Sequence, residues 1–329
     1  MKALFKFVLI FFLPLSLSAQ SNRFFNVKGK DIIAPNGKVI VLTGTNLGNW
    51  LIPEGYMFKF KDVGSPRMIN QVFTELIGPD KTAAFWKKYL DNYITKEDIH
   101  YLKSTGMNSI RIPFHYKMFT AESYLSSNNP NRGFELLDRV IKWCKEENLP
   151  VILDMHCAPG GQTGDNIDDS DGYPFLFENP ASQELTKSIW KKIALHYKDE
   201  TTVIGYDLLN EPIAHYFDTK KLNPYLEPLY KSITAEVRKV DKNHLIFLGG
   251  AQWDAKAGIV TFPVPENYNL VIKYADQPKT SFADLRKYAP TDRAVIEKAL
   301  NDLLERCKFS NCTTNDGYLK GLGLKTGKI

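Results

Sequence analysis

The chain has 329 residues, of which 43% are hydrophobic and 24% are charged, with a formal net charge of +5 at pH 7. This composition is ordinary for a soluble globular protein. The basic residues are scattered, with no tract denser than pairs such as Lys191-Lys192, so the charge excludes an obvious nucleic-acid-binding surface.

The N-terminus predicts a secretory signal peptide over residues 1–19. Basic residues precede an almost wholly apolar run, Phe7–Leu15, and Ser18 and Ala19 offer small side chains for cleavage. Leu17 does not suit a cut after Ala19, which leaves a retained membrane anchor as the alternative. The apolar run is short for a bilayer span, which favours cleavage and a secreted protein, extracellular or periplasmic. About 310 residues then remain, enough for one large domain.

Short apolar runs bounded by polar residues, glycine or proline predict strands that are buried on both faces. Stripes of apolar residues with helical spacing fall between them and predict helices over Gly133–Asn148, from about Ser182, and over Leu229–Val240. The predicted strands are Val39–Asn46, Asn108–Pro113, Val151–His156, Val203–Asn210 and Leu245–Leu248.

Repeated strand–helix units predict an α/β fold with a parallel sheet and right-handed crossovers. The chain length and the polar residues at the strand ends favour a closed barrel over an open sheet. No glycine-rich loop follows an early strand, which counts against a dinucleotide-binding fold.

The four cysteines do not make a disulfide scaffold. Cys144 and Cys157 suit buried positions, whereas Cys307 and Cys312 are close enough in sequence to pair outside the cell. No His/Cys spacing fits a zinc site, so we expect no metal and no other cofactor.

Polar residues stand at the ends of the predicted strands. Because the ends of parallel barrel strands converge on one mouth, their joint placement predicts a site, although each alone is more simply a paired charge or a satisfied core residue. These residues are Asn46, Arg111, His115, His156, Asn210 and Glu211.

Four segments carry a family resemblance: Gly44–Trp50 (GTNLGNW), Gly106–Phe114 (GMNSIRIPF), Asp154–Gly160 (DMHCAPG) and Asn210–Pro212 (NEP). In this order they resemble glycoside hydrolase family 5, which includes cellulases and exo-β-1,3-glucanases. The resemblance covers about residues 26–254 and implies a (β/α)8 TIM barrel that acts on a β-glucan polysaccharide or oligosaccharide. We expect the protein to be a monomer.

The same resemblance implies roles for single residues in a retaining mechanism. Glu211 is the general acid and base, Arg111 supports the nucleophile, and His156 and Asn210 bind the sugar at the cleavage point. Glu54 ends the segment Asn46–Glu54 (NLGNWLIPE), which resembles the opening motif of the β-glucanase branch, where that glutamate touches a sugar hydroxyl.

Further contacts with the sugar are predicted from residue type. His115 is a substrate-binding candidate, and Asp168 and Asp169 either contact sugar hydroxyls or form a solvated acidic loop. Sugars also stack on flat aromatic rings, for which core packing is the rival use. The candidate rings are Trp50, Tyr56, Tyr173, Phe175 and Trp253.

The strand–helix rhythm breaks after Gly250. The 79 residues that follow hold one clear helix near Ile296–Leu304 and two strand-like runs, Ile259–Phe262 and Asn269–Ile272. Three further units would need roughly 90 residues. The sequence therefore predicts an incomplete barrel, with residues 20–254 as its N-terminal part and 255–329 as a C-terminal remnant of the same domain.

By the family resemblance, an internal loss near Asp254/Ala255 removes the glutamate nucleophile. None of the nearby acids Glu227, Glu236, Asp254 and Glu266 has a nucleophile's sequence context. We therefore expect poor or absent hydrolysis. One alternative is a carbohydrate-binding protein of the same fold without catalysis, and another is an unrelated secreted α/β protein in which the motifs are coincidental.

Overall fold

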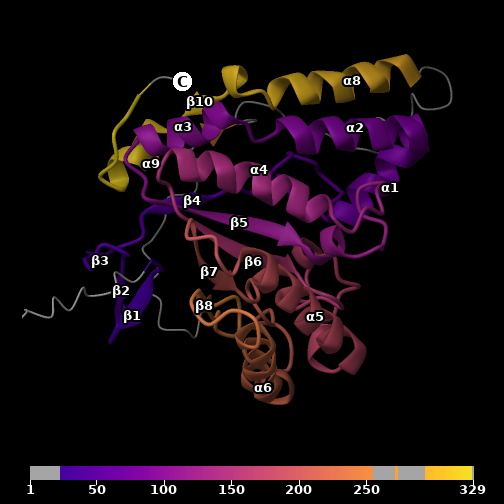
Figure 1. Ribbon diagram of the computed structural model, residues 1–329. Coiled ribbons are helices and arrows are strands. Elements are labelled where there is room, and N and C mark those ends of the chain that lie inside the picture. Colours follow the sequence, from indigo (N-terminus) through magenta and orange to yellow (C-terminus); the bar gives the residue numbers. More distant parts are fainter. Residues whose placement is uncertain (1–22, 255–270, 273–292, 328–329) are drawn as a thin grey trace, which may run out of the picture.

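A parallel sheet is the part of the fold that positions the polar strand ends. The structure is a computed structural model that describes residues 23–254, 271–272 and 293–327. Five strands of the sheet pair in parallel, each with the next in chain order (Figure 1). They are β4 (Gly44–Asn46), β5 (Ser109–His115), β6 (Val151–Cys157), β7 (Val203–Asp207) and β8 (Leu245–Phe247).

The predicted strands are confirmed with shifted ends, except that the first one divides. Val39 and Ile40 form β3 of a separate antiparallel sheet, and the parallel sheet takes only Gly44–Asn46. The reason is the Asn108 side chain, which accepts from the Thr43 N–H at 2.7 Å and donates to the Val41 carbonyl at 2.7 Å. These bonds replace the strand ladder between the two pieces.

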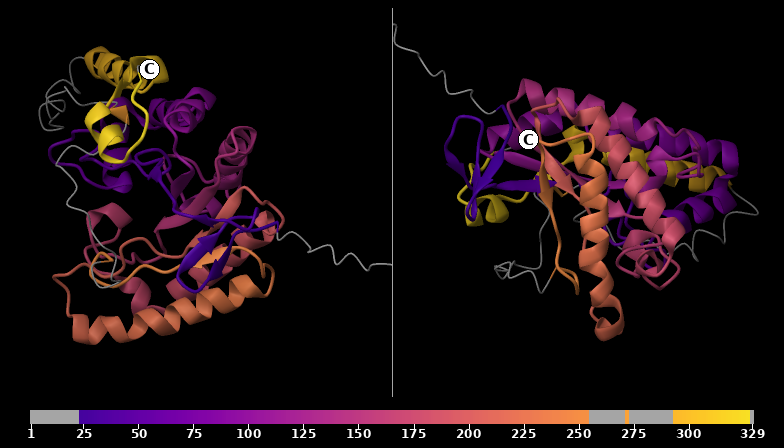
Figure 2. Two further views of the ribbon diagram at one scale, coloured as in Figure 1. Left: turned by 90° about the vertical axis from the view of Figure 1, so that its left-hand side faces the viewer. Right: turned by 60° about the horizontal axis from the view of Figure 1, so that its bottom comes forward.

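Three helices connect the strands at the predicted places, although the third begins at Thr219, ten residues before the predicted Leu229. They are α4 (Arg132–Glu146), α5 (Pro180–Tyr197) and α6 (Thr219–Arg238). Asn179 begins α5 by accepting from two backbone N–H groups, and Asp218 does the same for α6, which is how polar side chains cap helices. The sheet curves and the helices lie on its outer side, so the arrangement is an arc of a barrel (Figure 2).

Three helices between the first two strands of the sheet were not predicted. Ser65 and Pro66 open the first of them, and the second follows directly after Gly78. A reciprocal capping box of Thr95 and Asp98 opens the third. The helices are α1 (Pro66–Ile77), α2 (Pro79–Asn92) and α3 (Lys96–Ser104).

The described C-terminal part packs on the same core as the sheet. The predicted helix near Ile296 is α8 (Arg293–Arg306), which lies against α1 and α2 (Figure 1). Ile296, Leu300 and Leu319 are buried in the common apolar cluster. The remaining elements are β1 (Asn26–Lys28), β2 (Asp31–Ile33), β9 (Val271–Ile272), β10 (Thr313–Thr314) and α9 (Asp316–Gly321).

Several predictions concern residues outside the described ranges. The signal peptide over 1–19 and the strand-like run Ile259–Phe262 are among them, and the Asp254/Ala255 junction is described only on its N-terminal side. The thiols of Cys307 and Cys312 donate to the carbonyls of Leu303 and Lys308, as reduced cysteines do. Of the helices that the structure describes, none combines the length and the apolar character needed to cross a bilayer.

Candidate active site

A cavity of about 930 Å³ runs along the inner face of the parallel sheet, from strand starts such as Gly44 and Ser109 to the strand ends. Strands β4 to β7 and the segments that follow them line it, which is the place where a barrel carries its chemistry. Six of the predicted site residues line this cavity. They are Asn46, Glu54, Arg111, His156, Asn210 and Glu211.

Arg111 is the electrostatic centre of the cavity. It projects from β5, and its guanidinium lies 2.9 Å from Asp154 Oδ2 on β6 and 2.7 Å from Asp207 Oδ2 on β7. The same guanidinium donates to Asn210 Oδ1 at 3.0 Å. Three consecutive strands, β5 to β7, thus supply the charge and its partners. Burial and the nearby Asp154 raise the pKa of the Asp207 carboxyl.

His156 is held by the same carboxylate that contacts Arg111. Its Nδ1 lies 2.7 Å from Asp154 Oδ2, and its Nε2 faces the Asn210 amide at 3.4 Å. Burial lowers the pKa of His156, but the Asp154 and Glu54 carboxyls together oppose it, and the net shift is upward. The ring therefore has a fixed orientation and an Nε2 edge directed toward Asn210.

Glu211 follows β7 by four residues and belongs to the cavity lining. Burial raises the pKa of its carboxyl, while the positive charges of His156 and Arg111 partly oppose the shift. A carboxyl with a raised pKa keeps its proton closer to neutral pH and can act as a general acid. The predicted acid/base thus shares a cavity with Arg111 and His156.

Glu54 lines the cavity from a segment distant in sequence, the loop after β4. It is 7% exposed, and its main-chain N–H donates to Asn49 Oδ1 at 2.8 Å. Burial raises the pKa of its carboxyl, with His156 and a hydrogen bond from Tyr56 acting in the opposite direction. Tyr56 is 67% exposed and also lines the cavity, so of the proposed aromatic platforms it is the one at the site.

Asp254 brings a further carboxyl to the cavity, which the sequence context did not indicate. Burial and the Glu211 carboxyl raise the pKa of Asp254 to about 6, and the main-chain N–H of Glu211 faces it. Its Oδ1 is buried without a hydrogen-bond partner. The cavity lining therefore holds four carboxyl groups, Glu54, Asp207, Glu211 and Asp254, and burial raises the pKa of each.

The prediction that Trp50 contacts substrate is wrong. Its side chain is fully buried in the apolar core, and its indole N–H donates to the Leu90 carbonyl at 2.9 Å. The neighbouring Leu51 and Ile52 are buried as well, so this part of the segment is a core anchor. Glu54, two residues farther on, is the part of the segment that reaches the cavity.

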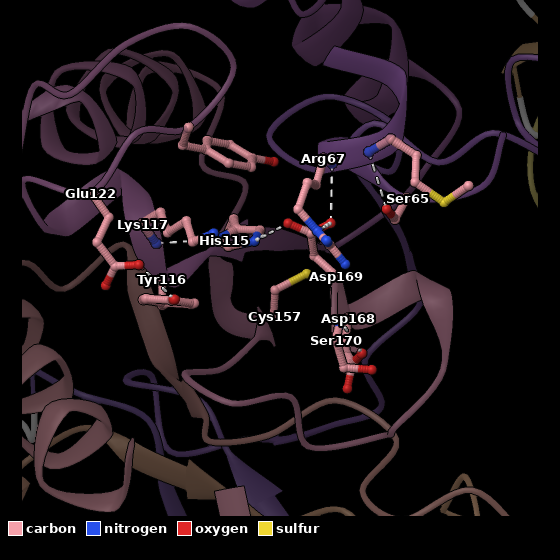
Figure 3. Close-up of polar contacts among 12 residues, drawn as sticks. Ser65, Arg67, His115, Tyr116, Lys117, Glu122, Cys157, Asp168, Asp169 and Ser170 are labelled. Atoms are coloured by element: carbon pink, nitrogen blue, oxygen red, sulfur yellow. Dashed lines mark hydrogen bonds and ion pairs between the residues drawn. The ribbon is translucent and has the colours of Figure 1, made fainter. Parts of the chain in front are cut away.

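The prediction that His115 binds substrate is also wrong. The ring is completely buried, stacks on Tyr116 and Tyr124, and does not line the cavity. Its Nδ1 accepts from the Lys117 N–H at 3.1 Å and its Nε2 lies 3.5 Å from Asp169 Oδ2 (Figure 3). His115 thus fastens the loop after β6 to the end of β5.

Neither prediction for Asp168 and Asp169 is correct. Asp168 is 2% exposed and accepts hydrogen bonds from backbone N–H groups of its own loop. Asp169 faces His115 and accepts from the Arg67 N–H at 3.0 Å (Figure 3). Both carboxylates organise a buried loop, and neither is a solvated charge.

The other proposed aromatic platforms lie outside the cavity lining. Tyr173 packs against Phe175 and Phe217 with ring centroids 4.9 Å and 5.5 Å apart. Trp253 meets His215 edge-on at 4.4 Å. These rings form a small aromatic group beside the site.

Asp154 and Asp207 are the functional residues that sequence reasoning missed. Asp154 is the one acid of β6, and Asp207 is the one acid of β7 and its last residue. A buried carboxylate needs a positive partner, and β5, next to β6, contains the basic residue Arg111. That combination was a usable signal. In the described ranges, no group of His, Cys, Asp and Glu could hold a metal ion.

A family model described as Cellulase (glycosyl hydrolase family 5) matches residues 72–314. The chain belongs to glycosyl hydrolase family 5. This confirms the family resemblance drawn from the sequence motifs.

This family 5 chain is 32% identical to a beta-xylosidase of Phanerodontia chrysosporium over 228 residues, 69% of this chain and 46% of that protein. It is 32% identical to a sporulation-specific glucan 1,3-beta-glucosidase of Saccharomyces cerevisiae over 257 residues, 72% of this chain and 56% of that protein. The chain therefore spans about half the length of these curated relatives.

A crystal structure of rutinosidase from Aspergillus niger superposes with a TM-score of 0.54 at 19% identity, over 64% of this chain and 62% of that chain. At this identity the likeness concerns the fold alone. It agrees with the predicted TIM-barrel class, of which the described residues form a partial barrel with five parallel strands.

Proposed function

We propose that this protein is a secreted glycoside hydrolase of β-glucan in which Glu211 is the general acid and base. The observation that carries the proposal is the meeting of Glu211, Arg111 and His156 in one cavity at the strand ends. The glucan 1,3-beta-glucosidase among the similar proteins supports the substrate class. Secretion is proposed from the leader over residues 1–19.

The chemistry requires a proton for the departing oxygen and a carboxylate for the cationic sugar. Glu211 suits the first task because burial raises its pKa. His156 and Asn210, fixed by Asp154 and Arg111, offer hydrogen-bonding edges to a sugar at the cleavage point. Glu54 and Tyr56 supply a carboxyl and an exposed ring on another wall of the cavity.

We expect catalysis to be weak compared with sugar binding. A retaining enzyme places a nucleophilic carboxylate about 5 Å from the acid/base. The glutamate that the family resemblance assigns to this role has no counterpart in the sequence, and Asp254 is tied to the Glu211 main chain. Binding of β-glucan without turnover is therefore the second candidate function.

The test is a reducing-sugar assay on a soluble β-1,3-glucan and on carboxymethylcellulose, run beside calorimetric binding to oligosaccharides. Glu211→Gln should abolish whatever turnover exists and retain binding. Glu227→Gln is the matched control, because that glutamate is exposed on α6 and pairs with Lys231. If the unaltered protein showed no turnover and no binding, the proposal would be refuted. Turnover at the rate of an ordinary glycoside hydrolase would refute the expectation that catalysis is weak.

A further inference from the structure

The main chain at Glu211 has a conformation that residues with a side chain rarely adopt. Its φ is 45°, and Ile213, two residues on, has a φ of 58°. Such left-handed residues persist only where their surroundings hold them. β7 ends at Asp207, and the Asn210 N–H, which donates to the Met155 carbonyl at 3.2 Å, continues the contact with β6 as far as the residue before Glu211.

Two side chains of the loop after β6 hold the peptide groups around Glu211. Thr163 Oγ1 donates to the Glu211 carbonyl at 2.9 Å. Gln162 Nε2 donates to the Asn210 carbonyl at 2.9 Å and to the His156 carbonyl at 2.7 Å. Gln162 and Thr163, called the clamp below, therefore bind the two peptide groups on either side of the Glu211 Cα.

The clamp is reinforced from the main chain. The N–H of Ile213 donates to the Gln162 carbonyl at 2.8 Å, and the N–H of Ala214 donates to the Thr163 carbonyl at 2.9 Å. Both clamp side chains are fully buried, so water does not compete for these bonds. The two chain segments thus pair immediately beyond the left-handed glutamate.

Asp168 braces the clamp from behind. Its Oδ2 accepts from the N–H groups of Thr163 at 2.7 Å and Gly164 at 2.9 Å, and its Oδ1 accepts from Ser170 at 3.0 Å. A buried carboxylate that receives several backbone N–H groups makes a rigid loop. Asp168 does not line the cavity, so its contribution passes through Thr163.

We propose that Gln162 and Thr163, braced by Asp168, are positioning residues that set the direction of the Glu211 side chain in the cavity. The proposal rests on the proposed function, because it gives Glu211 its role. Gln162 also donates to the carbonyl of His156, so one side-chain amide holds the main chain at His156 and next to Glu211 at a fixed separation. A loop that only added stability would not change the surroundings of the Glu211 carboxyl.

The test compares Thr163→Val, which removes the hydroxyl at nearly constant shape, with Thr163→Ser, which keeps it. The readout is the pKa of the Glu211 carboxyl by ¹³C NMR titration, with the signal assigned through its loss in Glu211→Gln. Release of the peptide exposes the carboxyl, so the pKa in Thr163→Val should fall by about half a unit or more, and Thr163→Ser should restore it.

Asp168→Asn provides a second variant that leaves both clamp side chains in place. It should move the pKa of Glu211 in the same direction as Thr163→Val, by a smaller amount. Asp171→Asn is its charge-matched control, since that carboxylate belongs to the same loop and is 78% exposed beside Arg67. A folded Thr163→Val protein with an unchanged Glu211 pKa would overturn the proposal, as would equal effects of Asp168→Asn and Asp171→Asn.

Oligosaccharide binding separates this inference from the proposed function. If the pKa of Glu211 responds to the clamp variants but the unaltered protein binds no glucan, the clamp stands and the proposed substrate fails. If the protein binds glucan and the pKa does not respond, the clamp fails alone. With both correct, Thr163→Val should also weaken binding about threefold to tenfold, the size of one lost hydrogen bond.

Discussion

The middle strands of the sheet and its last strand have the same topology but different surroundings. Most residues of β5, β6 and β7 are buried, whereas all three residues of β8 are only half-buried. Next to β8, residues of α6 and of the segment after the strand line an apolar groove of about 740 Å³. Leu248 in this groove is 53% exposed.

This difference explains why the polar set on the middle strands is so well defined. Asp154 on β6 and Asp207 on β7 both contact Arg111 on β5, so three consecutive strands hold the charge. In the segment after β8, Gln252, Trp253 and Asp254 all have positive φ. Burial of consecutive paired strands is what turns a set of polar strand residues into a defined site.

Removal of the Arg111 charge from the middle strands should cause the largest loss of stability. Arg111→Met leaves Asp207 without its cation and Asp154 with His156 alone, so we expect a loss of about 3–5 kcal/mol in the free energy of unfolding, measured with urea. Lys231→Met is the control, because that lysine pairs with Glu227 on the surface and should cost below about 1 kcal/mol. Equal losses would mean that the cavity network is no more than a surface ion pair.

Truncation of one leucine in β6 and one beside β8 should show how differently the two regions contribute to stability. Leu153→Ala in β6 deletes a fully buried side chain and should cost about 2–5 kcal/mol. Leu248→Ala, at the exposed groove, should cost below about 1 kcal/mol. Thermal and urea unfolding of both variants measure the difference. A large loss in Leu248→Ala would show that the groove is covered in solution.

The pH dependence of stability should reveal the raised pKa of Asp254, in the segment after β8. Because the folded state raises the pKa of Asp254 to about 6, it binds that proton more tightly than the unfolded chain. Stability is therefore lost as pH rises from about 4 to about 6. Asp254→Asn should remove this loss and gain up to about 1–2 kcal/mol at pH 7, after allowance for partial exposure.

The measurement is the free energy of unfolding of both proteins at pH 4 and pH 7. The gain from Asp254→Asn should be confined to pH 7, because the carboxyl is already protonated at pH 4. The exposed Asp171→Asn should give nearly equal changes at the two values. If Asp254→Asn gained the same stability at pH 4 and at pH 7, the loss of stability with rising pH would not come from Asp254.

The sequence by itself determined the strand–helix order, the family and the main members of the site. Apolar runs such as Val151–His156 are short, flanked by polar residues and separated by stripes with helical spacing. Such local patterns predict strands and helices without knowledge of the tertiary structure. The strand-end rule then brought Arg111, His156 and Glu211 together, because parallel strands place their ends at one mouth. The helices α1 to α3 had usable cap signals, Ser65-Pro66 and Thr95 with Asp98, that were not used.

Only the tertiary structure decided which polar and aromatic residues face the cavity. Trp50 and Glu54 lie four positions apart in one motif, yet one is core and the other lines the site. The roles of His115, Gln162 and Asp168 depend on partners from distant segments, such as Asp169 for His115 and Asn210 for Gln162. Burial and hydrogen bonding between remote segments are collective properties of the packed chain, which residue type and spacing do not encode.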